Sequence, residues 1–304
     1  MGNLSAHMRE DDIPPSRRPH TSDSLQLPSV SNLGTEPLKV VVKKATQWMD
    51  VCTSEGEKVH PMRSSPRGIF FMINNFQFEN NIEKPRTGAE VDERNLEELF
   101  TQFGYIVEKH HNEKLEDMMC KIREFAQRRE HSRYDSCVVA IMSHGRSRHS
   151  TQNSTIVSAD GQLLEISWVL DQFNNKNAQS LAAKPKIFFF QACRGEALDF
   201  GVKIRAGCTQ IDGCSSLVLP TMTDMLIGYS TLPGFVSNRN VYLGTWYIQA
   251  ICEVFMEHAC HKDIEVMLKL VAEKLATHIS EGGLMQTCCY ENRHFCKLYF
   301  NSGL

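Results

Sequence analysis

Several features that would assign the chain to a common class of protein are absent from its sequence. No apolar run approaches the ~18 residues of a membrane-spanning helix, and the N-terminus lacks the charged-then-apolar pattern of a secretory signal. Its 33 lysines and arginines do not outnumber its 36 acidic residues, so there is no basic excess for nucleic acid. The eleven cysteines are odd in number and irregularly spaced, which argues against a disulfide framework. We therefore expect a cytoplasmic protein with free thiols that binds neither membrane nor nucleic acid.

Sustained apolar periodicity is also absent from residues 1–62. Proline, serine and charged residues cluster there in DDIPPSRRPH and TSDSLQLPSVSNLGTEP, and only LKVVVKKATQWMDV suggests a short element. This composition predicts a mostly disordered, short prodomain. It is too short for a complete helical-bundle recruitment domain.

From residue 67 onward, short apolar runs alternate with amphipathic stretches. The runs GIFFMI, YIVEKH, SCVVAIMS, KIFFF, DMLIGYS and HFCKLYF indicate strands, the last over residues 294–300. Apolar residues at helical spacing predict helices that end at Gly104 and that cover about 115–125, 167–173, 244–259 and 263–279. Thr87 and Glu90 have capping-box spacing, and Asp160-Gly161 is the preferred pair of a two-residue hairpin. The alternation predicts an α/β fold, a mainly parallel sheet with helices on both faces.

Two of the buried runs end on chemically reactive residues. SCVVAIMS leads into His144 and Gly145, and KIFFF leads into Gln191 and Cys193. Open α/β sheets bind ligands beyond the carboxyl ends of their strands, so these side chains are expected to meet in one crevice. The spacing of 49 residues between His144 and Cys193 is weak support alone, since the chain has twelve histidines and eleven cysteines. The simpler interpretation is a buried structural cysteine and a surface histidine.

The motif QACRG with an upstream SHG resembles the caspase family of cysteine endopeptidases. The resemblance extends over about residues 67–300 through PRG, INN, RTGAEVDERNL, STLPGFVSNRN and GTWYIQAICEVF, and the last two segments suggest an invertebrate, insect-like initiator branch. It implies a three-layer sandwich and a thiol protease that cuts after aspartate. It also implies manufacture as a zymogen, a part in apoptosis or related proteolytic signalling, and no cofactor.

Peptide hydrolysis requires a nucleophile, a proton donor and an oxyanion hole, and each has a candidate. Cys193 would attack as a thiolate, and His144 would sustain the reactive protonation state and protonate the leaving amine. The backbone N–H groups of Gly145 and Cys193 would bind the oxyanion, since Gly145 has no side chain to obstruct the substrate carbonyl.

The resemblance places an aspartate-binding pocket at Arg86, Gln191 and Arg239. Guanidinium groups suit this task because each offers two parallel charge-assisted hydrogen bonds to a carboxylate. The adjoining residues Val236, Ser237 and Asn238 would contact the substrate upstream of aspartate. The family usually has tryptophan where this chain has Asn238, and many effector members have an aromatic residue at Val236, so we expect altered and more open pockets there.

Family zymogens are cut between two halves that stay assembled. Asp212 is the expected cleavage site, because it precedes a glycine in the small, polar stretch CTQIDGCSS. By contrast, Asp199 precedes a bulky phenylalanine, and Asp224 begins a buried strand. This divides the chain into a prodomain (1–62), a large subunit (63–212) and a small subunit (213–304), with a linker at 196–223. The expected partners are protein substrates, a second copy that pairs through the strand at 294–300, an activating protease and inhibitor proteins.

Two alternatives remain open at this point. A caspase homologue of weak activity could regulate true caspases by binding them, because a fold alone does not ensure catalysis. The stretch CCYENRHFC could instead supply a metal site from Cys288, Cys289, His294 and Cys296, although its spacing fits tetrahedral zinc poorly.

Overall fold

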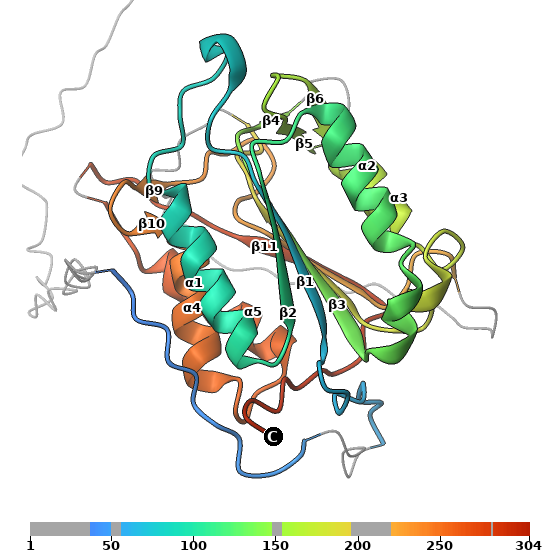
Figure 1. Cartoon of the computed structure of the whole chain (residues 1–304). Coiled ribbons are helices and arrows are strands. Elements are labelled where there is room, and N and C mark those ends of the chain that lie inside the picture. The colour runs from blue at the N-terminus through green and yellow to red at the C-terminus, as the bar shows by residue number, and fades with distance from the viewer. Residues whose placement is uncertain (1–36, 50–55, 148–153, 196–219, 281) are drawn as a thin grey trace, which may run out of the picture.

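A six-stranded sheet forms the centre of the protein (Figure 1). The computed structural model describes residues 37–49, 56–147, 154–195, 220–280 and 282–304. The strand order is β11-β8-β7-β3-β1-β2, and only β11 runs antiparallel to its neighbour. The strands are β1 (Gly68–Asn74), β2 (Ile106–His111), β3 (Ser136–Met142), β7 (Lys186–Gln191), β8 (Met225–Tyr229) and β11 (Cys289–Arg293).

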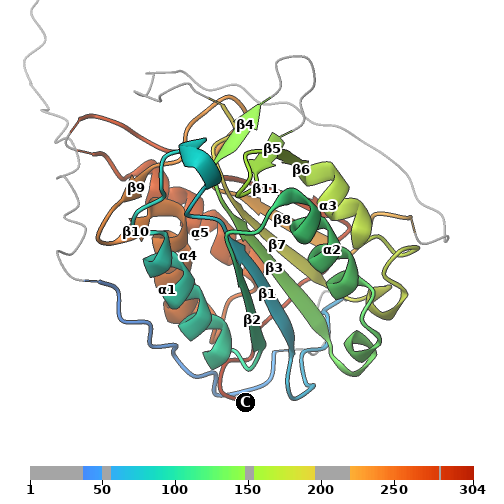
Figure 2. The same ribbon diagram turned by 45° about the horizontal axis from the view of Figure 1, so that its top comes forward.

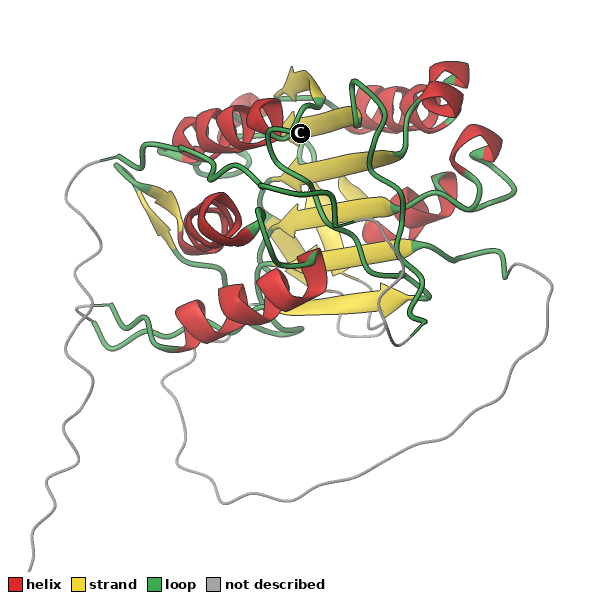
Figure 3. Ribbon diagram, turned by 90° about the horizontal axis from the view of Figure 1, so that it is seen from below, coloured by secondary structure: helices red, strands yellow, loops and turns green. Residues whose placement is uncertain are grey.

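Helices cover both faces of this sheet, as the views in Figures 2 and 3 show. One face carries α1 (Ala89–Gln102), α4 (Trp246–His258) and α5 (Ile264–Ala276), and the other carries α2 (Leu115–Ala126) and α3 (Ile166–Gln172). Smaller elements are β4 (Gly145–Ser147), β5 (Ser154–Val157), β6 (Leu163–Glu165), β9 (Arg239–Asn240), β10 (Gly244–Thr245) and three short 3-10 helices at Glu79–Asn81, Arg129–Arg133 and Gln179–Leu181. The predicted three-layer α/β sandwich is confirmed.

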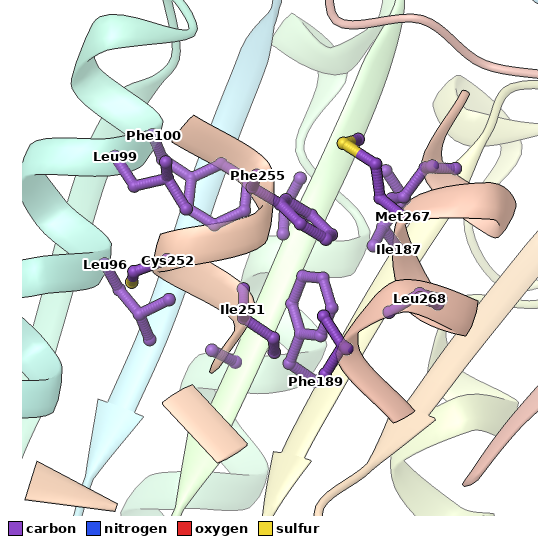
Figure 4. Packing of buried hydrophobic residues seen from close by; sticks show 14 of the residues in the cluster. Leu96, Leu99, Phe100, Ile187, Phe189, Ile251, Cys252, Phe255, Met267 and Leu268 are labelled. Carbon is purple, nitrogen blue, oxygen red and sulfur yellow. The ribbon is translucent and has the colours of Figure 1, made fainter. Parts of the chain in front are cut away.

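The core lies in two layers because side chains alternate along buried strands. In β1, Phe70 and Met72 pack beneath α1 and α4, whereas Phe71 and Ile73 pack beneath α2 and α3. Figure 4 shows the first layer, where residues of α1, α4 and α5 meet β7 around Phe189. Among the described residues, no helix is long and apolar enough to cross a membrane.

Three local predictions differ from the structure. The capping box at Thr87 and Glu90 is wrong, because α1 starts after Gly88, which has φ 88° and makes no side-chain cap. The hairpin at Asp160-Gly161 forms, but five residues and not two separate β5 from β6. Asp160 instead accepts the Leu115 N–H at 3.1 Å, at the start of α2.

The third difference concerns the last strand, which was expected at 294–300. The strand that pairs with β8 is β11, and the chain turns directly after it. The turn is made by His294, at φ 53°, and by Asn292, whose side chain accepts the Phe295 N–H at 2.8 Å. The apolar residues that mimicked a strand, such as Leu298, pack into the helical layer of the core.

Residues 37–49 belong almost entirely to the stretch LKVVVKKATQWMDV, which the sequence suggested as a short element, and they form no helix or strand. The segment runs extended over the ends of α1 and α4 and beside the C-terminal residues (Figure 1). The Gln102 side chain makes two hydrogen bonds with the backbone of this segment: its Oε1 accepts the Val42 N–H and its Nε2 donates to the Val40 carbonyl, each at 3.0 Å. The Lys43 N–H donates to the Met256 carbonyl at 2.8 Å, and the Ser302 hydroxyl donates to the Lys43 carbonyl at 2.6 Å. The segment therefore connects the first helix to the last quarter of the chain.

We expect this segment to contribute to stability. A protein that lacks residues 1–49 should melt about 5 °C or more below one that lacks residues 1–36, because several hydrogen bonds worth about 1 kcal/mol each are lost. Thermal unfolding of the two variants measures the difference. Equal melting temperatures would show that the contacts contribute nothing.

Candidate functional site

The sequence-predicted residues gather at the carboxyl end of the parallel strands. His144 lies two residues beyond β3, Gln191 ends β7, and Cys193 follows it. Arg86 reaches the end of β1, where its Nη1 donates to the Asn75 carbonyl at 2.9 Å. The neighbouring strands β1, β3 and β7 thus each contribute to one site, as expected for a parallel sheet.

Gly145 lies directly against the segment that carries the cysteine. A Cβ atom at Gly145 would lie 2.1 Å from the Cys193 carbonyl oxygen and 2.9 Å from the Ala192 Cβ, so no other residue fits. From the sequence, a glycine was expected here because a side chain would obstruct the substrate carbonyl. The structure shows a second reason, which is that a side chain would collide with Cys193 and Ala192. The Ser237 N–H points at the Cys193 Sγ from 3.4 Å, which places residue 237 beside the thiol.

The His144 imidazole is oriented by the backbone of a loop ahead of α1. Its Nε2–H donates to the Lys84 carbonyl at 2.8 Å, because a carbonyl can only accept. The other ring nitrogen, Nδ1, is then free to accept a proton. Burial lowers the pKa of His144, and the ring of Phe78 lies 5.1 Å away between centroids. The imidazole is therefore neutral near pH 7 and available as a base.

Arg86 is a buried cation. Its side chain is 2% exposed, and its Nη1 also donates to the Asn74 Oδ1 at 3.1 Å. Burial, followed by the nearby charge of Arg239, lowers its pKa to about 10, which still leaves it protonated at neutral pH. Burial also lowers the pKa of the half-buried Arg239 of β9, although the charges of Asp92, Cys193 and Glu90 act in the opposite direction.

Neither arginine has a carboxylate partner in the part of the chain that the structure describes. Within the described residues, no acidic oxygen lies within 4.0 Å of Arg86 or Arg239. The buried carboxylate of Asp92 acts on both arginines without forming an ion pair with either, so the two neighbouring cations keep a net positive charge and mark a place prepared for an anion. Gln191 borders it: its Nε2 donates to the Ser237 Oγ at 2.8 Å, and its buried Oε1 has no hydrogen-bond partner in the described chain.

The segment that follows residue 235 is tied to the loop before β11. The Asn238 N–H donates to the Gln286 Oε1 at 2.7 Å, and the Asn238 side chain donates to the Met285 carbonyl at 3.4 Å. Val236 lines a small pocket with Met285 and Gln286. The asparagine thus binds the neighbouring loop through polar contacts, where a tryptophan would offer an apolar wall.

Other candidate residues have structural roles or lie elsewhere. The Arg194 Nε donates to the Ser154 Oγ at 2.7 Å, and its guanidinium lies 4.1 Å from the centre of the Tyr229 ring. These contacts hold the loop after β7, which carries Cys193, against β5 and β8. Asp224 is 3% exposed, which agrees with its rejection as a processing site. Both Asp212 and Asp199 lie outside the described residues.

The structure contradicts the alternative of a metal site at Cys288, Cys289, His294 and Cys296, all of which are described. In the described ranges, no group of three or more histidine, cysteine or acidic side chains is placed to hold a metal ion. The four residues of CCYENRHFC point to different surroundings, since Cys289 lies 3.4 Å from Arg194 and His294 is exposed in a turn.

Sequence reasoning missed two residues of the site. Asn74 orients Arg86, and it lay unexamined within the motif INN. Asp92 is a fully buried carboxylate beside the arginine pair, within RTGAEVDERNL. A charged residue at a helix position that should face the core was the available signal for Asp92.

Known proteins resemble this chain in both sequence and fold. The family model described as Caspase domain matches residues 67–300. Caspase-2 of Gallus gallus is 35% identical over 74% of this chain and 56% of its own length. Cell death protein 3 of Caenorhabditis remanei is 34% identical over 78% of this chain and 51% of its own length. The solved structure of Caspase-1 from Spodoptera frugiperda superimposes with a TM-score of 0.71 and 28% identity, over 82% of this chain and 96% of that one.

The chain spans little more than half the length of the first two relatives. These relatives come from a bird and a nematode, and the solved structure comes from an insect. The similarity therefore extends beyond the insect-like branch suggested by the sequence.

The environment of His144 makes a prediction about its titration. Phe78→Ala should admit water to the ring and raise the pKa of His144 toward 6.5, because burial is the main cause of its lowering. Proton NMR titration of the imidazole measures this, with Phe76→Ala as a control, since Phe76 packs on His111 at 5.9 Å. A wild-type imidazole that titrates at 6.5 or higher would contradict the account.

Proposed function

Because the chain belongs to the caspase family, we propose that it is a cysteine endopeptidase that cuts proteins after aspartate. The observation that carries the proposal is the pair Arg86 and Arg239, two cations without a carboxylate partner in the described chain, beside Cys193. An aspartate side chain would supply the missing counter-charge. Guanidinium groups would bind it more strongly than any neutral side chain of the same size.

The proposed chemistry is nucleophilic catalysis. The Nδ1 of His144 takes the thiol proton, and the Cys193 sulfur then attacks the backbone carbonyl carbon of the bound aspartate. The protonated imidazole returns the proton to the leaving amine, and water later hydrolyses the thioester. The backbone N–H groups of Gly145 and Cys193 bind the oxyanion, and the close packing of these two residues supports that role.

Gln191 completes the proposed pocket after a small change. Its amide now donates to Ser237 and leaves Oε1 without a partner. Rotation of the amide by about 180° would let Oε1 accept from the Ser237 hydroxyl and turn the NH₂ group toward the substrate carboxylate. Upstream of aspartate, Asn238 and Val236 leave more room and a polar surface, so small or polar substrate residues are favoured there.

We propose that the protein is a zymogen processed into a large subunit (63–212) and a small one (213–304). The linker at 196–223 joins the last strand-end residues of one half to the first strand of the other. Dimerisation is assigned to the free edge of β11, which pairs only with β8 among the described residues. This moves the expected interface from 294–300 to Cys289–Arg293. Such a protease would act in apoptosis or related signalling, under an activating protease and inhibitor proteins.

The pocket makes a prediction about specificity. Arg239→Ala should lower kcat/KM on aspartate peptides about 100-fold or more, because a substrate carboxylate would lose charge-assisted hydrogen bonds worth roughly 2 to 5 kcal/mol. Steady-state kinetics measures this, with Cys193→Ala as the inactive reference and circular dichroism as the folding control. Near wild-type efficiency in the Arg239 variant would rule out the proposed pocket.

Processing makes a separate prediction. Mass spectrometry of the activated protein should find a small subunit that begins at Gly213, because Asp212 precedes a glycine in a small, polar stretch of sequence, the composition at which proteases commonly cut. Asp212→Ala should block this cut, and Asp199→Ala should not. A small subunit that begins elsewhere would refute the choice of Asp212.

A further inference from the structure

The two arginines of the pocket come from separate parts of the chain. Arg86 lies on the loop that leads into α1, and Arg239 lies on β9, 153 residues later. A pocket for one short carboxylate requires a fixed distance between the two guanidinium groups. Some contact must therefore hold the β9–β10 hairpin against the start of α1.

Asp92 makes such a contact. It lies in the first turn of α1, is fully buried, and its Oδ1 accepts the Thr245 N–H at 2.7 Å. Thr245 is the residue directly opposite Arg239 in the antiparallel pair of β9 with β10. One hydrogen bond thus connects the helix that follows Arg86 with the strand partner of Arg239.

Two glycines allow the hairpin to come this close. A Cβ atom at Gly244 would lie 2.3 Å from the Asp92 Oδ1, and one at Gly88 would lie 2.6 Å from the Val241 carbonyl oxygen. Both glycines also have positive φ angles, of 91° and 88°. The backbone on each side of the contact is therefore shaped for it.

The carboxylate is costly for a purely structural bond. Burial raises the pKa of Asp92 to about 6, and its Oδ2 has no hydrogen-bond partner among the described residues. Arg86 and Arg239 are the cations that act on it, and they lower its pKa. On α4, the titratable group that interacts with Asp92 is Cys252, whose pKa is raised mainly by burial and also by the charge of Asp92. A buried carboxylate with one unpartnered oxygen is costly to maintain. Its place beside Arg86 and Arg239 indicates that it helps to position them.

We propose that Asp92 is a positioning residue of the carboxylate pocket, which holds Arg239 at a fixed place relative to Arg86 through its hydrogen bond with Thr245. This inference rests on the proposed function. Its consequence is discrimination by length: the pocket should bind aspartate and reject glutamate, whose carboxylate lies one methylene further out.

The test compares kcat/KM on two peptides that differ only in aspartate or glutamate at the cut site. Asp92→Ala should lower the aspartate-to-glutamate ratio about tenfold or more, because a shift of about 1 Å in a binding group is enough for such losses. Asp92→Asn keeps an oxygen that can accept the Thr245 N–H, so it should keep most of the ratio. Glu97→Gln lies on the same helix as Asp92 and removes a surface ion pair with Lys109 of β2, so it should change nothing.

Each outcome decides the proposal. An Asp92→Ala enzyme with the wild-type ratio would overturn it, and so would an Asp92→Asn enzyme as impaired as the alanine variant. If Asp92→Ala does not fold, Gly244→Ala tests the same bond from the hairpin side, and an unchanged ratio there would also overturn the proposal. A wild-type protein that cleaves neither peptide would instead refute the proposed function, and this inference with it.

Discussion

Two guanidinium groups held close together in a partly dry site repel each other, and the structure around them is arranged to tolerate that cost. Arg86 is kept in place by the oxygens of Asn74 and Asn75, which are neutral and cannot cancel its charge. The pocket therefore stays positive in the free protein. A carboxylate that enters replaces repulsion with attraction, so binding energy is concentrated on one acidic side chain.

The parallel sheet brings this pocket and the nucleophile together. The end of β1 supplies the hydrogen-bond acceptors of Arg86. The end of β3 leads to the imidazole of His144, and the end of β7 supplies Gln191 and leads to Cys193. The small β9–β10 hairpin then carries Arg239 to the same edge from the other half of the chain. Each of these contacts joins described residues that lie outside the linker.

Much of this arrangement could be predicted from sequence, and the failures have physical causes. Buried strands that end on His144 and Cys193 were visible as apolar runs, because strand burial leaves a direct mark on composition. The arginines required family resemblance, since a lone arginine is usually a surface charge. Asp92 was missed because its partner, Thr245, is 153 residues away, and no local pattern reports such a contact. The prediction of a strand at 294–300 was wrong because an irregular tail that packs on the core is as rich in apolar residues as a strand.

The central claim is that the substrate side chain must carry a negative charge to be bound by the two arginines. Aspartate and asparagine have nearly the same size, so a matched pair of peptides with one or the other at the cut site isolates the charge. We expect kcat/KM to favour aspartate by about a thousandfold or more, because an amide cannot neutralise the buried Arg86 and the half-buried Arg239. Comparable cleavage of the asparagine peptide would contradict the account, and failure to cleave either peptide would favour a regulator that acts by binding.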